Sequence, residues 1–246
     1  MDTRTQEFLN NPILPLLVRM AAPNTIAFFI QAIVVLTEVW FISKLGTTSL
    51  AAVALAFPIL MITQQMAFGA LGGAVTSSIA RSIGAGDTIR AEKLLWHSLL
   101  IASCGAVVFL LAFLLGGESL LKILGGKGPL LEESLSYCMI FLTGGILIWL
   151  SGSLSAALRG MGNMRYPAML MSISSGMQVI LSGGFILGWF GFPKLGIAGA
   201  AVSALASGGF MSLMMFLKLS SSSSKINLKI SRFSFEKELF KDILDV

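Results

Sequence analysis

Residues 94–117 read LLWHSLLIASCGAVVFLLAFLLGG and contain no Asp, Glu, Lys or Arg. A bilayer-spanning helix needs about 20 consecutive, mainly apolar residues, so this stretch alone is long enough to cross a membrane. Its apolar side chains follow one another without the alternation expected of a lipid-facing β-strand. The stretch therefore predicts a transmembrane helix and indicates an all-α membrane protein.

Five further segments have the same character, which predicts six spans in total. The first contains Arg19 near its start and Glu38 towards its end, and in the others charges are confined to the ends. The predicted spans are residues 13–42, 50–80, 94–116, 134–157, 166–190 and 196–218. Residues 1–219 are accordingly expected to form one six-helix transmembrane bundle, embedded in the lipid bilayer.

The composition of the whole chain agrees with this prediction. Of its 246 residues, 55% are hydrophobic and only 12% are charged, with a mean hydropathy of +0.86. Soluble domains carry about a quarter charged residues, so this chain could not cover a water-facing surface. The same imbalance excludes a disordered protein, a nucleic-acid-binding module and a disulfide-stapled secreted domain.

The 17 basic residues are distributed unevenly between the two ends of the predicted bundle. With the N-terminus in the cytoplasm, thirteen of them, including Arg81, Arg90 and Arg159, lie on the cytoplasmic side and four on the other. Because Lys and Arg concentrate in cytoplasmic loops, both termini are predicted to be cytoplasmic. This topology, together with contact to anionic headgroups, explains the net charge of +5.

The C-terminal residues 220–246 differ in composition from the spans and are expected on the cytoplasmic side. Residues 220–224 are a run of serines typical of a flexible linker. In residues 235–244 apolar side chains recur at helical spacing, which predicts a short amphipathic helix lying in the membrane interface.

Glu38 is the one acidic residue that falls inside a predicted span. A carboxylate there costs several kcal/mol unless it faces a cavity, a partner or a bound proton. Gln31 lies two helical turns earlier on the same face, which would give this helix a polar lining. Two alternatives stay open: Glu38 can be a structural residue of the outer interface, and Gln31, Gln64 and Gln178 can each make an ordinary interhelical hydrogen bond.

Arrangements of residues typical of a soluble enzyme are not found in the sequence. His97 is the only histidine, so a histidine metal cluster and a Ser/His/Asp triad are unsupported. Gly84 and Gly86 lack the following Gly-Lys-Ser/Thr of a P-loop. We therefore expect neither an enzyme nor ATP-driven transport in this chain, and neither a cofactor nor a nucleic-acid partner.

Four stretches of the chain, in order and spacing, resemble motifs of the multidrug and toxic compound extrusion (MATE) transporter family. They are EVWFISKLG with LAAV in residues 38–53, ARSIGAGD in 80–87, LRGMGNMRYP in 158–167 and LGIAGAA in 195–201. The resemblance implies one lobe, the N-terminal one, of a two-lobe multi-pass transporter in the plasma membrane, the inner membrane of a bacterium. Members of the family have two six-helix lobes in one chain, so this chain is about half of a full-length member.

The resemblance also implies a function and a site. It implies secondary-active efflux of small amphipathic or cationic molecules, coupled to Na⁺ or H⁺ bound at Glu38, with Gln31, Gln64, Gln178 and Ser182 lining the cargo cavity. Three features depart from the family pattern: Glu38 stands where Asp is usual, Ser43 stands where Gly is usual, and the fifth-helix Asn-x-x-x-Asp pair reads Gln178 to Ser182. Without that second carboxylate, Glu38 is expected to titrate alone.

Two other functions stay open at this point. A lipid-linked oligosaccharide flippase of the same superfamily would have similar lobes but usually a more basic cavity, and no Lys or Arg beyond Arg19 is expected within the membrane. The chain can also be a truncated remnant without transport activity, or half of a split transporter that pairs with a second six-helix lobe. Residues 220–246 lead towards the point where such a lobe would begin.

Overall fold

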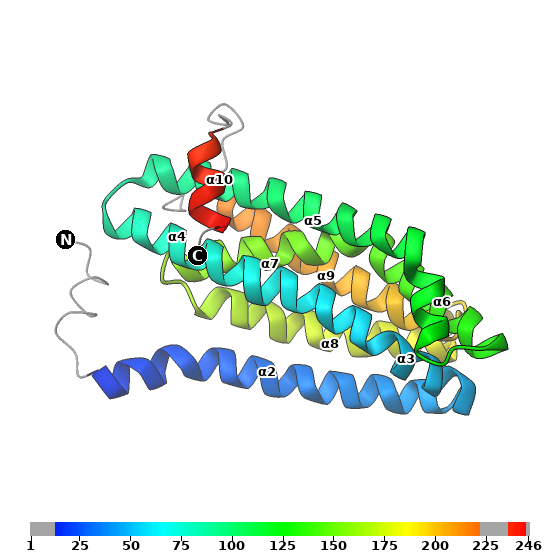
Figure 1. The fold of residues 1–246 in the computed structure, drawn as a ribbon. Helices are drawn as coiled ribbons and strands as arrows, with labels where there is room; N and C mark the ends of the chain where they lie inside the picture. The colour runs from blue at the N-terminus through cyan, green and yellow to red at the C-terminus, as the bar shows by residue number, and fades with distance from the viewer. Residues whose placement is uncertain (1–12, 222–235, 245–246) are drawn as a thin grey trace.

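The computed structural model describes residues 13–221 and 236–244. Every regular element in these residues is a helix (Figure 1), which confirms the predicted all-α fold. In chain order they are α2 Ile13–Ser43, α3 Thr47–Gln64, the π-helix η1 Gln65–Leu71, α4 Gly72–Gly84, α5 Thr88–Ile123, α6 Gly128–Thr143, α7 Gly145–Gly160, α8 Arg165–Leu187, the 3₁₀-helix η2 Trp189–Gly191, α9 Ile197–Ser220 and α10 Lys237–Leu244.

The long helices of the described part of the chain are consistent with six membrane crossings. Five stretches are individually long and apolar enough: Ala21–Ser43, Thr47–Gly84, Thr88–Ile123, Arg165–Leu187 and Ile197–Ser220. The sixth is the pair α6 and α7, which together meet the same criteria and are bent by 48°. The start of α2, the α4–α5 turn, the α7–α8 turn and the end of α9 consequently share one end of the bundle (Figure 1), here named the N end.

The helices extend past the charge-free runs from which the spans were predicted. α5 begins at Thr88, before the uncharged run at residue 94, and Asp87 caps it by accepting a hydrogen bond from the Arg90 backbone N–H at 2.9 Å. Charged side chains are tolerated at these ends because they reach out of the hydrocarbon region towards water. The length of a charge-free run therefore reflects the thickness of the hydrocarbon region rather than the length of the helix.

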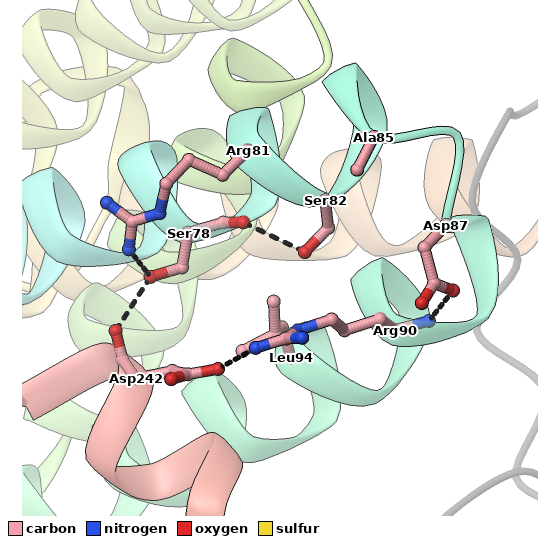
Figure 2. Close-up of a pocket in the computed structure, with 8 residues that line it drawn as sticks. All are labelled: Ser78, Arg81, Ser82, Ala85, Asp87, Arg90, Leu94 and Asp242. Atoms are coloured by element: carbon pink, nitrogen blue, oxygen red, sulfur yellow. Dashed lines mark hydrogen bonds and ion pairs between the residues drawn. The ribbon is translucent and has the colours of Figure 1, made fainter.

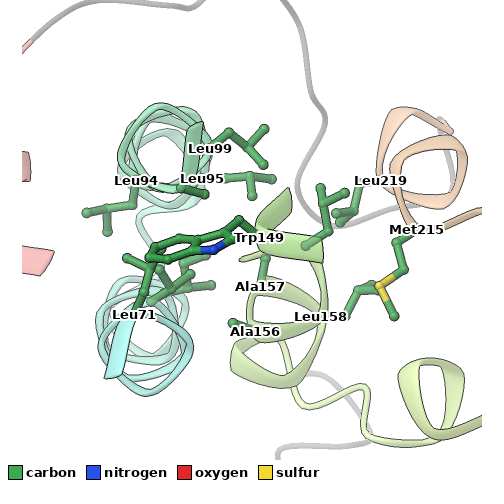
Figure 3. Packing of buried hydrophobic residues seen from close by; sticks show 14 of the residues in the cluster. Leu71, Leu94, Leu95, Leu99, Trp149, Ala156, Ala157, Leu158, Met215 and Leu219 are labelled. Carbon is green, nitrogen blue, oxygen red and sulfur yellow. The ribbon is translucent and has the colours of Figure 1, made fainter. Parts of the chain in front are cut away.

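The helix α7 is the most enclosed part of the bundle, because residues 151–158 are all buried. It packs against α4, α5 and α9. Figure 3 shows the Trp149 ring of α7 between α5 and the helix that carries Leu71. Gly105 of α5 makes room for this ring, since a Cβ atom there would lie only 2.8 Å from the indole Cη2.

The outside of the bundle is apolar as well. Phe29 and Leu36 of α2 are each 70% exposed, and Leu115 of α5 is 89% exposed. A surface of this kind is stable only when lipid tails or another apolar surface cover it. The helix α2 packs chiefly on α8 and lies at the edge of the bundle (Figure 1).

The short helix α10 lies across the N end against α4 and α5 (Figure 1). Leu239 and Ile243 are buried in the main core cluster, and Phe240 meets the His97 ring edge-on with 5.1 Å between the ring centroids. Three apolar residues of the predicted amphipathic helix, Leu239, Phe240 and Ile243, thus pack against protein. Of the predicted serine linker, only Ser220 and Ser221 are among the described residues.

Polar contacts also join α10 to α4 and α5. Ser78 Oγ of α4 donates a hydrogen bond to the Asp242 carbonyl at 2.9 Å, and the Asp242 carboxylate pairs with Arg90 (Figure 2). A second ion pair joins Lys93 Nζ to Glu236 Oε1 at 2.5 Å. The side chains of the two ion pairs are partly exposed, so these pairs contribute little to stability.

Candidate functional site

A cavity of about 530 Å³ lies among α2, α3, η1, α6, α7, α8 and α9. This volume is typical of a site for a small organic molecule. The long helices contribute residues three or four positions apart, which form one face of each helix. The lining residues are Asn24, Phe28, Gln31, Gln64, Gln65, Phe68, Phe141, Ile148, Ser151, Ser155, Arg159, Pro167, Ala168, Met171, Ser174, Ser175, Gln178, Ala204, Ser207, Gly208 and Met211.

Gln64, Gln65 and Phe68 reach this cavity where the second crossing changes helix type. At Gln65 the α-helix α3 passes into the π-helix η1, which continues to Leu71. A π-turn contains more residues than an α-turn, so it changes the direction in which successive side chains point, and such turns are frequent at functional sites. Two amides and an aromatic ring are thereby placed on the cavity side.

Glu38 of α2 is held by two side chains of α8. Its Oε1 accepts hydrogen bonds from Gln178 Nε2 at 3.0 Å and from Ser182 Oγ at 2.5 Å. Both donors reach the same oxygen because they are one helical turn apart. Ser182 is fully buried and does not line the cavity, whereas Gln178 does. Glu38 therefore lies just outside the cavity wall and contacts it through Gln178.

The Gln178 side chain links Glu38 to α9. Its Oε1 lies 3.3 Å from Ser207 Oγ, which also bonds to the Ala204 carbonyl of its own helix at 3.0 Å, and its Nε2 faces Glu38. The Ser207 carbonyl in turn accepts from Ser174 Oγ at 2.7 Å. One series of hydrogen bonds therefore connects α2, α8 and α9.

Gln31 lies on the same face of α2 as Glu38. Its Oε1 accepts a hydrogen bond from Ser175 Oγ of α8 at 2.9 Å, and both residues line the cavity. The contact between α2 and α8 is thus polar along two turns of each helix. Of the residues predicted for the site, Gln64 also lines the cavity, so Ser182 is the one predicted lining residue that the structure places elsewhere.

Sequence reasoning missed the serines that line the cavity. Ser175, for example, donates a hydrogen bond to the Gln31 side chain of another helix. Ser98 and Ser203 look the same in the sequence, but their hydroxyls bond to carbonyls of their own helices, at 2.7 and 2.6 Å. Because a helical serine can satisfy its hydroxyl in either way, no local pattern could have separated the two groups.

Arg159 also lines the cavity, which the sequence did not predict. It lies on the last turn of α7, at the end of the bundle where its charge was expected. Its side chain runs back along the helix, and Nη1 donates a hydrogen bond to Ser155 Oγ at 3.2 Å. The structure thus adds a basic side chain to the wall of this cavity.

Comparison with known proteins gives one family match. The protein-family model MatE matches residues 23–183. An FAD transporter of Shewanella oneidensis is 34% identical over 206 residues, which are 81% of this chain and 44% of that protein. A probable multidrug resistance protein NorM of Thermotoga maritima is 27% identical over 192 residues, which are 78% of this chain and 41% of that protein.

A solved structure shows the same architecture. The outward-facing conformation of a multidrug resistance MATE family transporter of the MOP superfamily superposes with a TM-score of 0.83 at 31% identity. The match covers 93% of this chain and 50% of that chain. The chain thus corresponds to one lobe of such a transporter and spans about half the length of the relatives it matches.

Proposed function

From the premise that the chain belongs to the MATE family of multi-pass membrane transporters, we propose that it is the N-terminal lobe of a secondary-active exporter driven by a cation at Glu38. One observation carries this proposal. The Gln178 side chain donates a hydrogen bond to Glu38 and also lines the cargo cavity. A change in the charge of Glu38 therefore alters the strength of a hydrogen bond made by a residue that cargo would contact.

The hydrogen bonds indicate how cation and cargo influence each other. Ionised Glu38 accepts from Gln178 and Ser182, and charge-assisted bonds of this kind are about twice as strong as neutral ones. A proton or a metal cation on Glu38 weakens both bonds and frees α2 to shift on α8. If that shift favours one orientation of the lobe, cation binding biases alternating access, and cargo must weaken cation binding by the same factor.

The donors around Glu38 favour H⁺ over Na⁺ as the coupling ion. Na⁺ needs oxygen ligands, and the Glu38 carboxylate and the Ser182 hydroxyl can provide them. Gln178 presents its amide nitrogen to this site, so the side chain would have to turn over to supply a third oxygen ligand. Protonation of Glu38 needs no such rearrangement.

The cargo belongs to one of two chemical classes. Organic cations follow from the MATE resemblance, and the Thermotoga relative bears the name of a multidrug resistance protein. The Shewanella relative is named an FAD transporter, and FAD is an aromatic anion because of its phosphates. A small amphipathic molecule is common to both classes and suits a cavity lined by aromatic rings and amides.

Replacing Glu38 tests the coupling role. The chain, together with a second six-helix lobe, is reconstituted in proteoliposomes, and efflux of a fluorescent cargo is followed under an imposed pH gradient. Glu38→Gln is expected to reduce gradient-driven efflux about tenfold or more, because the amide cannot exchange a proton. Cargo binding without a gradient should persist.

The matched control is Glu118→Gln on α5. Its carboxylate is 60% exposed and pairs only with Lys122 one turn away among the described residues, so efflux should not change. Full gradient-driven efflux by Glu38→Gln would show that the coupling role is wrong. Absence of any efflux by the unmodified assembly would favour a non-transporting remnant.

A further inference from the structure

The cargo cavity contains a single formal charge, and it is positive. Of the described residues that line it, Arg159 is the only charged one, and no Asp or Glu is among them. Asn24 and four glutamines add amide groups, and five serines add hydroxyls. A cationic cargo would therefore find a guanidinium and no carboxylate in this wall.

Arg159 has hydrogen-bonding capacity left over. A guanidinium carries five N–H donors, and within the described residues one of them is used, by Ser155 Oγ at 3.2 Å. None of the ion pairs described for the chain involves Arg159. Gly72 of α4 lies beside it, where a Cβ atom would be 3.6 Å from Nη2.

The direction of the side chain does not suit a role confined to the helix end. A basic residue in a last turn often stabilises the C-terminal carbonyls of its helix. The Arg159 side chain instead turns back by one helical turn to Ser155, and both residues line the cavity. Its charge is thereby directed into the cavity, where a desolvated guanidinium attracts a carboxylate or phosphate by paired hydrogen bonds.

We propose that Arg159 binds an anionic group, a carboxylate or a phosphate, on the exported molecule. Phe28, Phe68 and Phe141 would contact an aromatic or apolar body in the same cavity, and the amides would bind its polar edges. This inference rests on the proposed export function and selects the anionic class of cargo.

Two dyes of similar shape and opposite charge test the proposal. Fluorescein is a dianionic xanthene at pH 7.5, and rhodamine 123 is a cationic one. Their affinities for the purified chain in phosphatidylcholine nanodiscs are measured by fluorescence anisotropy, with empty nanodiscs as the blank. The unmodified chain should bind fluorescein more tightly than rhodamine 123, and less tightly as ionic strength rises.

Variants at Arg159 distinguish the effect of losing its charge from the effect of damaging the cavity. Arg159→Gln should weaken fluorescein binding about tenfold while rhodamine 123 binds equally well or better, which also shows that the cavity is intact. Arg159→Lys should retain part of the affinity, because it keeps the charge but not the paired geometry. Arg165→Gln, an exposed arginine at the start of α8 that does not line the cavity, should change neither dye.

The outcomes distinguish this proposal from the coupling proposal, because binding is measured without a gradient and with Glu38 unchanged. Failure to bind fluorescein, a preference for rhodamine 123, or equal fluorescein affinity with and without Arg159 would each overturn it. Phosphatidic acid added to the nanodiscs identifies the source of the anion. If it displaces fluorescein, the anionic group belongs to a lipid, and if it does not, the cargo is a soluble anion.

Discussion

Gly199 of α9 is the point where α9 approaches the α8 backbone most tightly. A Cβ atom there would lie 2.6 Å from both the carbonyl carbon and the carbonyl oxygen of Phe185. These are backbone atoms, so they cannot move aside as the end of a flexible side chain can. The contact between α8 and α9, which positions Gln178 and Ser207, therefore requires glycine at this position.

Gly199→Ala is expected to destabilise the protein by about 1–3 kcal/mol, the usual range for overpacking a close contact. Gly176→Ala on α8 is the matched control, since no atom lies within 4 Å of its Cβ position. It should leave stability unchanged or raise it by up to about 1 kcal/mol through helix propensity. Thermal unfolding in detergent measures both, and equal stability of the two variants would contradict so close an approach of α9 to α8.

Some residues of the site could be recognised from the sequence and others could not. Glu38 stands out in the sequence because a carboxylate in an apolar run is costly, and its seven-residue spacing from Gln31 places both on one helix face. Ser175 is a serine like any other until α8 is placed beside α2. Arg159 was missed because an arginine at the end of an apolar run looks like a loop charge, and sequence does not show in which direction the side chain turns.

At the scale of helices, the crossings could be predicted from charge-free runs, but their irregularities could not. The π-helix after Gln64 has no sequence signature of its own, whereas the 48° bend between α6 and α7 falls at the glycine pair 144–145. Gly144 at the bend is closely approached by Leu205 of α9, whose Cδ2 would lie 2.7 Å from a Cβ atom. Both features follow from packing between helices that are distant in sequence.

The attachment of α10 is expected to depend on its apolar residues. Leu239 and Ile243 are buried, and truncating a buried Leu or Ile to Ala costs about 2–5 kcal/mol. Leu239→Ala should therefore detach α10 from α4 and α5, which hydrogen–deuterium exchange would show as faster exchange in residues 237–244. Asp242→Asn removes only a partly exposed ion pair with Arg90, worth about 0–1 kcal/mol, and should leave α10 attached. Release by Asp242→Asn alone would show that charge dominates.

At the scale of the whole molecule, the basic residues of the described helices are distributed unevenly between the two ends of the bundle. Arg81, Arg90, Arg159, Arg165 and Lys218 belong to the ends of helices at the N end. The opposite end contains the turns with Lys44, Lys127 and Lys194. The excess of basic residues predicts that the N end faces the cytoplasm.

Cysteine labelling tests this orientation. In a chain whose Cys104 and Cys138 are replaced by serine and alanine, a single cysteine is introduced at Ala85 or at Lys127, in turns at opposite ends. A membrane-impermeant maleimide added to intact bacterial cells should label Lys127→Cys, and Ala85→Cys only after the membrane is opened. The reverse labelling pattern would invert the topology and would contradict the basic-residue argument.

The six crossings also bear on how a two-lobe transporter can arise. An even number of crossings returns the chain to the side on which it started, here at the end of α9. A tandem duplication of the gene for such a unit would yield a second copy already inserted in the same direction, related to the first by an axis along the membrane normal. If a unit with an odd number of crossings were duplicated, the second copy would have to insert in the opposite orientation. The basic residues in the loops of that second copy would then lie on the wrong side of the membrane and would have to change first.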